Sequence, residues 1–407
     1  MAAAPPPRTA CAIAGGGPAG MMLGFLLARA GVEVVVCEKH GDFLRDFRGD
    51  TIHPSTLQVM HELGLLDAFL ALPHQEVRKL RGIVGDTEIT LADFGHLPTR
   101  CRFIALMPQW DFLDFLADQG ARYPGFHLAM QAEVTDLIEE GGRIAGMRGQ
   151  TQDGVFEVRA DLAIGADGRH SVVRECAGLK VMNLGAPIDV LWMRLPKRIG
   201  DPQETAGRID RGRMLVTLDR GDYWQCAFVI RKDGFAEMRA RGLEAFRADI
   251  VAIAPFLRDR VAELRDWDDV KLLTVAVDRL EQWWRPGLLC IGDSAHAMSP
   301  IGGVGINLAV QDAVAAANIL AEPLRDGTLA DTHLAAVQRR RMLPTRLTQA
   351  MQVAIQERVI DPVLKSDAPL TAPWPVRLFN RVPSLARIPA RLIGMGIRPE
   401  HVRSPAA

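Results

Sequence analysis

The glycine-rich stretch near the N-terminus has the residue types and the spacing of a phosphate-binding turn. A short apolar run leads directly into Gly15, Gly17 and Gly20, which follow the pattern G-x-G-x-x-G. The first glycine permits a sharp turn, the second lets backbone amides approach a pyrophosphate, and the third lets the next helix pack closely on the strand. Pro18 and Ala19 open that helix, and a helix N-terminus favours an anion. The pattern predicts a dinucleotide site.

Glu38 supplies the acidic group that such a site requires. It ends a β-branched run that follows the helix, about 20 residues beyond the glycines, where a carboxylate can accept hydrogen bonds from a ribose. A carboxylate there would repel a 2′-phosphate, which argues against NADP as the resident ligand. The alternative is an ordinary glycine turn followed by a surface glutamate. The strand, helix, strand and acid arrive in the right order, and this favours the dinucleotide site.

Asp167 and Gly168 follow a second buried run, over residues 161–165. Ligands bind at the carboxyl ends of the strands in open α/β sheets, so this position suits a contact with a ligand. Asp-Gly is also a common turn dipeptide. The position leaves both interpretations open.

Gly292 and Asp293 end a third buried run and precede a glycine-rich loop from Pro300 to Asn307. A long Ala-rich helix is expected to begin near Ile306 or Asn307. The loop amides and the helix N-terminus would form a second cluster of donors for a negatively charged group. An ordinary glycine loop is the alternative, and a second such construction in one chain makes it less favoured.

Several single residues are weaker candidates. Arg48 follows Glu38 closely enough to neutralise a phosphate, although a solvated loop arginine fits equally well. Gln109 stands at the start of an amphipathic helix, where its amide could reach a phosphate or could be an ordinary N-terminal residue. His53 is interpreted as a helix-entry residue and not as a base. Tyr223 and Gln225 share one face of a predicted strand, and the sequence leaves open whether that face packs on helices or lines a pocket.

The chain of 407 residues exceeds the usual limit of about 250–300 residues for a single hydrophobic core, so we predict two interlocked domains. Strand-like alternation around the turn at Gly85-Asp86 indicates strands that join a different sheet. We predict a doubly wound α/β domain at residues 1–76, 107–178 and 285–325, a domain built on an antiparallel sheet at residues 77–106 and 179–284, and a helical C-terminal region at residues 326–407.

Charge and composition argue against several classes of protein, namely nucleic-acid-binding, metal-binding, secreted and membrane-spanning proteins. A net charge of −1 with mixed surface charges argues against a nucleic-acid partner. The six cysteines form no CxxC pair and are expected to be reduced core residues, not metal ligands or disulfides. The N-terminus lacks an apolar core of signal-peptide length, and no apolar run approaches a membrane span. These features predict a cytoplasmic protein without a metal site.

The three motifs in this order resemble the class A flavoprotein monooxygenases, the group that includes para-hydroxybenzoate hydroxylase and the ubiquinone-pathway hydroxylases. The resemblance extends to about Leu320 and is specific for the fold and for FAD, but not for the substrate. It implies a Rossmann-like FAD-binding domain with an inserted substrate domain. The residues that it implies for FAD are Gly15, Gly17, Pro18, Ala19, Gly20, Glu38, Lys39, Arg48, Gln109, Asp167, Gly168, Gly292, Asp293, Pro300, Gly303, Val304, Gly305, Ile306 and Asn307.

The resemblance also implies a reaction. NADH or NADPH would reduce the flavin, and O2 would then form a C4a-hydroperoxide that hydroxylates a small aromatic or quinone-like molecule. No acid–base residue is required, and the loop with Pro300, Gly303 and Gly305 would lie against the flavin ring. Tyr223 and Gln225 are candidates for substrate contact. The alternatives are an FAD-dependent dehydrogenase or reductase without oxygen insertion and, less favoured, a flavin carrier. The W-x-W-x-I-P motif of flavin halogenases is absent.

The C-terminal stretch from Thr371 carries arginines among apolar residues and almost no acid. Such a segment can lie on a membrane, but its prolines divide it into short pieces. We expect it to pack on its own protein with the arginine heads in solvent, and peripheral membrane contact is the less favoured alternative. The protein is expected to be a monomer or a homodimer.

Overall fold

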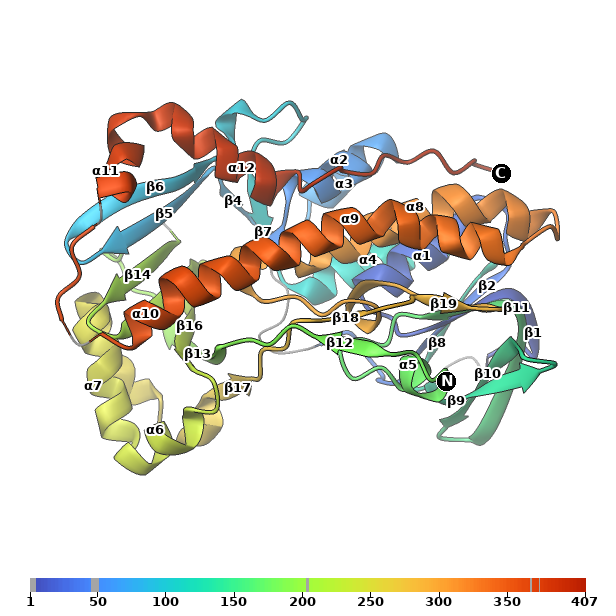
Figure 1. The fold of residues 1–407 in the computed structure, drawn as a ribbon, viewed down its shortest axis with the longest axis horizontal. Helices are drawn as coiled ribbons and strands as arrows, with labels where there is room; N and C mark the ends of the chain where they lie inside the picture. The colour runs from blue at the N-terminus through green and yellow to red at the C-terminus, as the bar shows by residue number, and fades with distance from the viewer. Residues whose placement is uncertain (1–4, 45–50, 203–204, 367, 373) are drawn as a thin grey trace.

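The computed structural model describes residues 5–44, 51–202, 205–366, 368–372 and 374–407, without the side chains of residues 374–376 and 379 (Figure 1). Its largest sheet has the strand order β19-β20-β11-β1-β2-β8, in which the four pairs from β20 to β8 are parallel and β19 is antiparallel. The strands are β1 (Arg8–Ala14), β2 (Val34–Glu38), β8 (Phe126–Met130), β11 (Gly154–Gly165), β19 (Trp284–Arg285) and β20 (Leu288–Cys290). This is the predicted doubly wound sheet.

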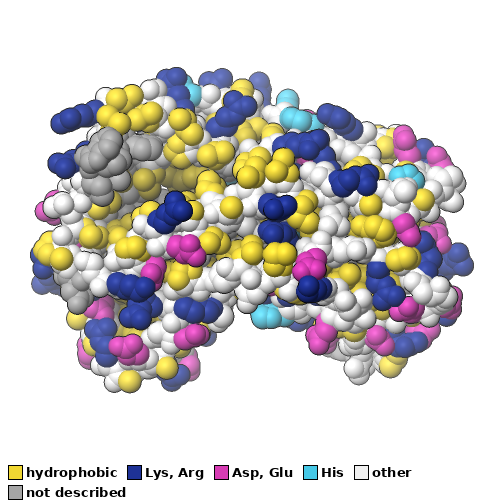
Figure 2. All heavy atoms as spheres, viewed as in Figure 1, with side chains coloured by type: hydrophobic (Ala, Val, Ile, Leu, Met, Phe, Trp, Pro, Cys, Tyr) yellow, Lys and Arg dark blue, Asp and Glu magenta, His cyan; other side chains and the backbone are white. Residues whose placement is uncertain are grey.

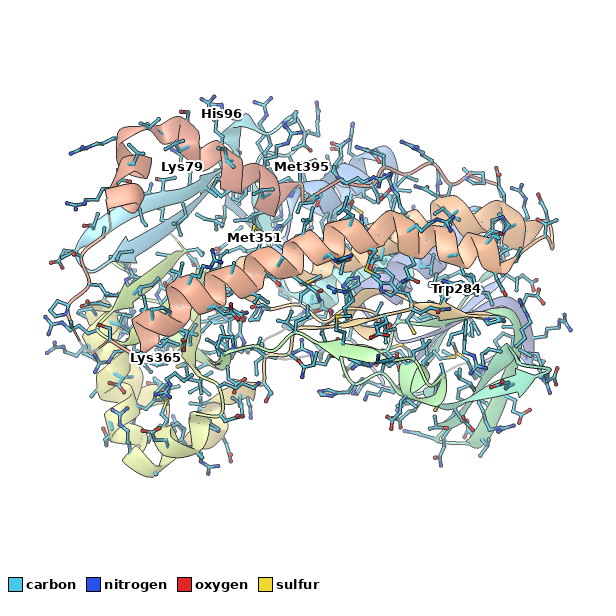
Figure 3. All side chains as sticks on the ribbon, in the orientation of Figure 1. Lys79, His96, Trp284, Met351, Lys365 and Met395 are labelled. Atoms are coloured by element: carbon cyan, nitrogen blue, oxygen red, sulfur yellow. The ribbon has the colours of Figure 1, made fainter. Side chains whose placement is uncertain are left out.

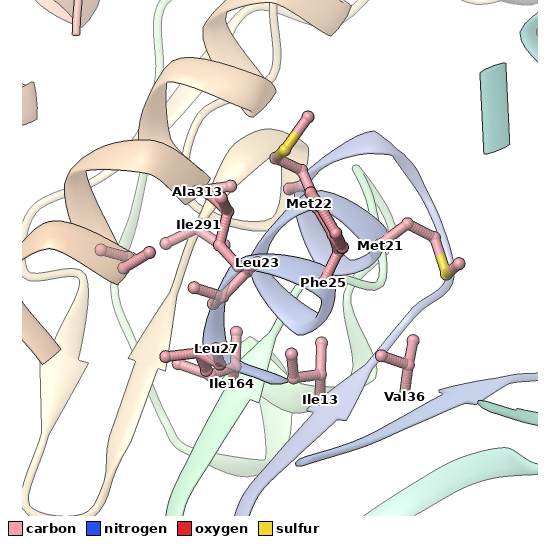
Figure 4. Close-up of a cluster of buried hydrophobic side chains, with 14 of the residues drawn as sticks. Ile13, Met21, Met22, Leu23, Phe25, Leu27, Val36, Ile164, Ile291 and Ala313 are labelled. Atoms are coloured by element: carbon pink, nitrogen blue, oxygen red, sulfur yellow. The ribbon is translucent and has the colours of Figure 1, made fainter. Parts of the chain in front are cut away.

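Helix α1 (Pro18–Arg29) is buried between this sheet and α8 (Gly305–Arg325), and it also contacts α4 (Gln109–Gly120). Apolar side chains on almost every side of α1 explain this position, because a helix that is apolar all round must be covered all round. Figure 4 shows the resulting core, in which side chains of α1 meet strand and helix residues from distant parts of the chain, among them Ile13, Leu23, Phe25, Ile164, Ile291 and Ala313. This packing fixes the positions of the N-termini of α1 and α8 relative to the sheet.

Strand β11 is longer than the buried run that the sequence places at residues 161–165, because it is one strand of 12 residues. Its first half pairs antiparallel with β10 (Arg143–Thr151), which pairs in turn with β9 (Glu133–Glu140), and its second half pairs parallel with β1. A single strand can serve both partners because each half uses a different edge.

A second sheet has the order β17-β13-β16-β15-β14-β5-β6 and is antiparallel except between β14 and β5. Strands β5 and β6 come from the segment around Gly85-Asp86 and join strands more than 100 residues later, as predicted. Helices α6 (Phe235–Arg241) and α7 (Leu243–Ile253) follow β16. The strands are β5 (Lys79–Val84), β6 (Thr87–Asp93), β13 (Ile188–Pro196), β14 (Ala206–Asp210), β15 (Arg213–Asp219), β16 (Tyr223–Arg231) and β17 (Lys271–Leu273).

Two small sheets belong to neither of the two large sheets that the sequence predicts. β3 (Thr51–Ile52) and β4 (Gln75–Val77) both pair with β7 (Ile104–Leu106). The stretch at residues 271–280 is divided between β17 in the second sheet and β18 (Asp278–Leu280), which pairs with β12 (Val181–Asn183). The domain boundaries themselves stay a prediction.

Short helices complete this part of the chain. They are α2 (Pro54–Glu62), α3 (Leu66–Leu70) and α5 (Val172–Cys176). One helical stretch, Ile301–Arg325, is long and apolar enough to cross a membrane, which corrects the expectation that no run approaches that length. Of its apolar window, 83% is buried inside the protein, as in a core helix.

The C-terminal region begins with α9 (Asp331–Ile355), which crosses the molecule diagonally and continues through a π-helical turn (Gln356–Ile360) into α10 (Asp361–Leu364) (Figure 1). Helices α11 (Trp374–Arg381) and α12 (Arg387–Gly394) then lie over β6. Ala390 and Met395 share a buried cluster with Phe94 and Leu97. The tail therefore packs on its own protein through small and apolar side chains.

Candidate functional site

The turn between β1 and α1 shows why each glycine is needed. Gly15 has φ +103°, and a β-carbon there would lie 2.4 Å from the carbonyl oxygen of Ala166. A β-carbon at Gly20 would lie 2.0 Å from the carbonyl oxygen of Gly15. At Gly17, by contrast, no atom of the described residues lies within 4 Å of the β-carbon position. The fold itself requires Gly15 and Gly20, while Gly17 leaves space in front of the N-terminus of α1, where Pro18 is the first helical residue.

Glu38 lies at the end of β2 and turns back towards the glycine turn. Its Oε2 accepts a hydrogen bond from the backbone N–H of Gly16 at 2.9 Å, and its Oε1 lies 2.6 Å from Nδ1 of His40. The carboxylate is therefore beside the glycine turn, where the resemblance places a ribose. Lys39 points outward and is exposed. Arg48 lies outside the described residues.

Asp167 lies at the end of β11, next to the same turn, because the N–H of Ala166 donates to the carbonyl of Ala14 at 2.8 Å. The Asp167 carboxylate accepts from the Ser171 hydroxyl at 2.5 Å and from the N–H of Val173 at 3.1 Å, and so caps α5. Burial raises the pKa of Asp167, and these hydrogen bonds oppose the shift. The Asp167 side chain stabilises the turn that leads into α5. Its contact with a cofactor stays a prediction.

Gly292 and Asp293 follow β20. Gly292 has φ +61°, its N–H donates to Oδ2 of Asp312 at 3.1 Å, and a β-carbon there would lie 3.0 Å from the β-carbon of Ala19 in α1. The Asp293 side chain is one-third exposed and lies 3.6 Å from the guanidinium of Arg169. The structure thus brings the three sequence motifs together at the carboxyl ends of β1, β11 and β20.

The loop from Pro300 to Asn307 is tied to the segment before α2. The Thr51 hydroxyl donates to the carbonyl of Gly303 at 2.9 Å, and Oδ1 of Asn307 accepts from the N–H of His53 at 3.0 Å and from the Thr56 hydroxyl at 2.7 Å. The side-chain amide of Asn307 also lies within 3.4 Å of the Thr51 and Gly303 carbonyls. Asn307 therefore fixes the loop with its side chain, which leaves its backbone for a ligand.

Helix α8 begins at Gly305, one or two residues before the start predicted near Ile306 or Asn307, and Val304 and Ile306 beside it are buried. At Gly305, as at Gly17, no described atom lies within 4 Å of the β-carbon position. Two helix N-termini at the carboxyl edge of one sheet thus keep open space that any other residue type would partly fill. Backbone amides and helix dipoles at both places suit an elongated ligand with negatively charged groups, as FAD has.

A buried ion-pair network stands behind this site, and sequence reasoning missed it. Nε2 of His296 lies 2.5 Å from Asp312, whose other oxygen accepts from Nε of Arg341 at 2.8 Å, and Arg341 lies 3.4 Å from Glu400. Burial alone would raise the pKa of Asp312, but the charges and hydrogen bonds of His296 and Arg341 outweigh it and lower the pKa. The sequence signal for part of this network is the spacing Gly-Asp-x-x-His, which places His296 three residues after Asp293.

Of the weaker candidates, Gln109 is the first residue of α4, as predicted. Gln225 is buried and its Oε1 accepts from Nε of Arg220 at 3.1 Å, while Tyr223 is half-buried with the Arg194 guanidinium 5.2 Å from its ring centre. The Trp224 face of β16 packs with α7, so Gln225 and Ala227 lie on the other face of the sheet.

Comparison with known proteins agrees with this geometry. A family model described as an FAD-binding domain matches residues 8–351. The chain belongs to this FAD-binding family. It is 33% identical over 403 residues to 6-methylpretetramide 4-monooxygenase of Streptomyces rimosus, an alignment that covers 98% of this chain and 94% of that protein.

Two solved structures show the same fold. PqsL of Pseudomonas aeruginosa, described as a probable FAD-dependent monooxygenase, matches with a TM-score of 0.74 at 21% identity over 88% of this chain and 98% of that one. OxyS anhydrotetracycline hydroxylase of Streptomyces rimosus matches with a TM-score of 0.73 at 22% identity over 95% of this chain and 76% of that one. The chain is an FAD-dependent oxidoreductase of the monooxygenase type, as the sequence predicted.

Proposed function

We propose that the protein hydroxylates a fused-ring aromatic molecule, with NADH or NADPH as the reductant and O2 as the oxygen source. When bound, FAD supplies the oxygen-activating chemistry. The chain supplies binding, orientation and a surface that excludes water. The names of 6-methylpretetramide 4-monooxygenase and anhydrotetracycline hydroxylase support a fused-ring aromatic substrate.

The observation that carries the proposal is the second sheet's inner face. Trp192, Ala227 and Val216 are direct cross-strand neighbours on β13, β16 and β15. They belong to one apolar cluster with Ile301 of the loop after β20, and Trp192 and Val216 are only half-buried. An apolar row that shares a cluster with this loop fits an aromatic ring system. Gln225 lies two residues from Ala227 along β16, on the same face, and its cross-strand neighbours are Arg194 and Leu218.

The test follows NAD(P)H oxidation under labelled O2 with fused-ring aromatic candidates. One labelled atom in the product supports the proposal. Substrate-stimulated turnover without label would favour the dehydrogenase or reductase alternative. Val216→Phe should raise KM at least tenfold without loss of FAD, because the added ring occupies the apolar row. An unchanged KM would place the substrate elsewhere.

We further infer that the C-terminal tail serves packing and not membrane contact. The cluster of Ala390 and Met395 with Phe94 supports this, as does the hydrogen-bonding distance of 2.8 Å from the Ile393 carbonyl to Nδ1 of His53. The exposed arginines of α11 and α12 have room to keep their charges in water. Flotation with vesicles that contain anionic phospholipid should leave the protein in the soluble fraction, and co-flotation would overturn the inference.

A further inference from the structure

The long helix α9 is polar on its buried side. Between residues 341 and 356, the side chains that are at most 6% exposed are mainly those of Arg341, Thr345, Thr348, Gln349, Gln352 and Gln356. Leu343 and Leu347 on the opposite side are 52% and 45% exposed, and Figure 2 shows hydrophobic side chains along this part of the surface. An ordinary surface helix has the reverse pattern. Polar groups that are buried this deeply must make hydrogen bonds to be tolerated.

The three glutamines Gln349, Gln352 and Gln356 all make hydrogen bonds with residues 297–301, and Gln349 also makes them with β18. Gln349 donates to the carbonyls of Asp278 and Ala297 at 2.6 and 3.1 Å and accepts from Arg279 at 2.8 Å. Its amide therefore joins α9 to β18 and to the chain that leads away from the Gly292-Asp293 turn.

Gln352 makes the most extensive contacts. Its Oε1 accepts from the N–H of Ser299 at 3.2 Å, and its Nε2 donates to the carbonyls of Ser299 and Ile301, each at 3.0 Å. Nε2 of Gln356, one turn later, lies 2.5 Å from the Ser299 hydroxyl, which also accepts from the N–H of Ile301 at 3.3 Å. The side-chain amides thus replace the strand partner that this segment lacks.

The segment that they hold leads directly into the loop opposite the second sheet. Gly302 and Gly303 follow with φ +78° and +63°, and α8 begins at Gly305. Thr51 and Asn307 fix the far side of the loop. The near side is fixed from α9, so side chains from other parts of the chain, Thr51 and the α9 glutamines, hold both sides of the glycine turn.

We propose that Gln349, Gln352 and Gln356 are positioning residues that hold the flavin loop in place. The proposal rests on the proposed function only in assuming that this loop lies against the flavin ring. It gives a role to α9, which contacts β19, the strand that carries Trp284, and has Met351 in its C-terminal part (Figure 3). Beyond α9, the π-helical turn and α10 lead to Lys365. Gln352 and Gln356 lie just beyond the matched FAD-binding region, which ends at residue 351. They do not touch the reacting atoms; they act through the backbone of Ser299 and Ile301.

The test compares Gln352→Leu with Gln338→Leu in the FAD-loaded protein. Gln338 is a matched control, because it lies on the same helix and also makes two main-chain hydrogen bonds, to Trp283 and Glu281, away from the loop. Amide hydrogen exchange of residues 297–305 should be at least tenfold faster in Gln352→Leu and unchanged in Gln338→Leu. The ratio of the affinities for reduced and oxidised FAD, read from the midpoint potential, should change at least threefold only in Gln352→Leu.

Ser299→Ala is a second variant for the case that Gln352→Leu does not fold. It removes the hydroxyl between Gln356 and Ile301 without altering α9, and it should increase exchange in the same segment about threefold. Unchanged exchange and potential in the folded variants would overturn the proposal, as would equal changes in Gln338→Leu. Neither measurement involves substrate or oxygen transfer, so a failure of the proposed hydroxylation would leave this test intact.

Discussion

The carboxylate of Asp312 lies 2.5 Å from Nε2 of His296, and both side chains are at most 1% exposed. The same carboxylate accepts the N–H of Gly292 and is paired with Arg341 on α9. A charge on α8 therefore holds the turn that carries Asp293, and a cation from the C-terminal region balances it. The Asp312 side chain therefore links the Gly292 turn to the C-terminal region.

Replacing Asp312 with asparagine should destabilise the protein by about 3 kcal/mol, because the change leaves the buried Arg341 without its nearest counter-charge. The Gly292 turn should loosen as well and release FAD more readily. Urea unfolding and the FAD content after dialysis measure the two effects. Asp326→Asn is the control, since its partner Arg325 is exposed and such pairs contribute roughly 0–1 kcal/mol. Equal losses in both variants would contradict the role of the buried charge.

The glycines allow a separation of binding from folding. Gly17→Ala and Gly305→Ala introduce a methyl group into open space, so we expect unchanged stability of the FAD-free protein and at least tenfold weaker FAD binding. Gly20→Ala should instead prevent stable folding, because its β-carbon would lie 2.0 Å from the Gly15 carbonyl. Thermal unfolding without FAD and titration with FAD measure these outcomes. Full FAD affinity in Gly17→Ala would show that the ligand lies elsewhere.

Features encoded by neighbouring residues could be predicted. The Gly15 to Gly20 turn, the helix start at Pro18 and the hairpin at Gly85-Asp86 each depend on local backbone requirements, and the structure confirms them. The break between β17 and β18 is different, because the partners of these two strands, β13 and β12, lie in different sheets. Only tertiary pairing decides such a break.

In the candidate site, too, the local motifs could be predicted from the sequence but their tertiary partners could not. Gly292 and Asp293 were found because a buried run ends there, whereas the partners that fix this turn come from α8, α9 and residue 400. Gln352 gave no signal, because a glutamine in a helix is ordinary until its inward direction is known. The sequence predicts which groups meet a ligand, but not the distant side chains that hold them.

His53 should make stability depend on pH. Burial lowers its pKa to about 4, against 6.5 for an ordinary histidine, so the unfolded chain takes up the proton first as the pH falls. The stability is complete above about pH 6.5 and is lost progressively towards pH 4, by up to about 3 kcal/mol. His53→Asn can still donate to the Ile393 carbonyl but does not titrate, so its melting temperature should fall less between pH 7 and pH 5 than that of the unchanged protein. His127→Asn, at an exposed site, should leave the pH profile unaltered.

Asp293 is the acid of the site with the most freedom to meet a ligand. Its ion pair with Arg169, at 3.6 Å, is partly exposed, so the pair itself should contribute no more than about 1 kcal/mol to folding. A hydrogen bond from a ligand hydroxyl to a carboxylate contributes about 1.5–3 kcal/mol. Asp293→Ala should therefore weaken FAD binding by roughly 10- to 100-fold with little change in the melting temperature of the FAD-free protein.

Two comparisons sharpen this expectation for Asp293. Asp293→Asn keeps an acceptor and should retain part of the affinity. Asp161→Ala removes a similar exposed partner of an arginine, Arg8 at 3.5 Å, away from the site, and should leave FAD binding unchanged. If Asp293→Ala binds FAD as tightly as the Asp161→Ala control, the carboxylate has no part in holding the cofactor, and the backbone of the Gly292 turn alone must supply the contacts at the end of β20.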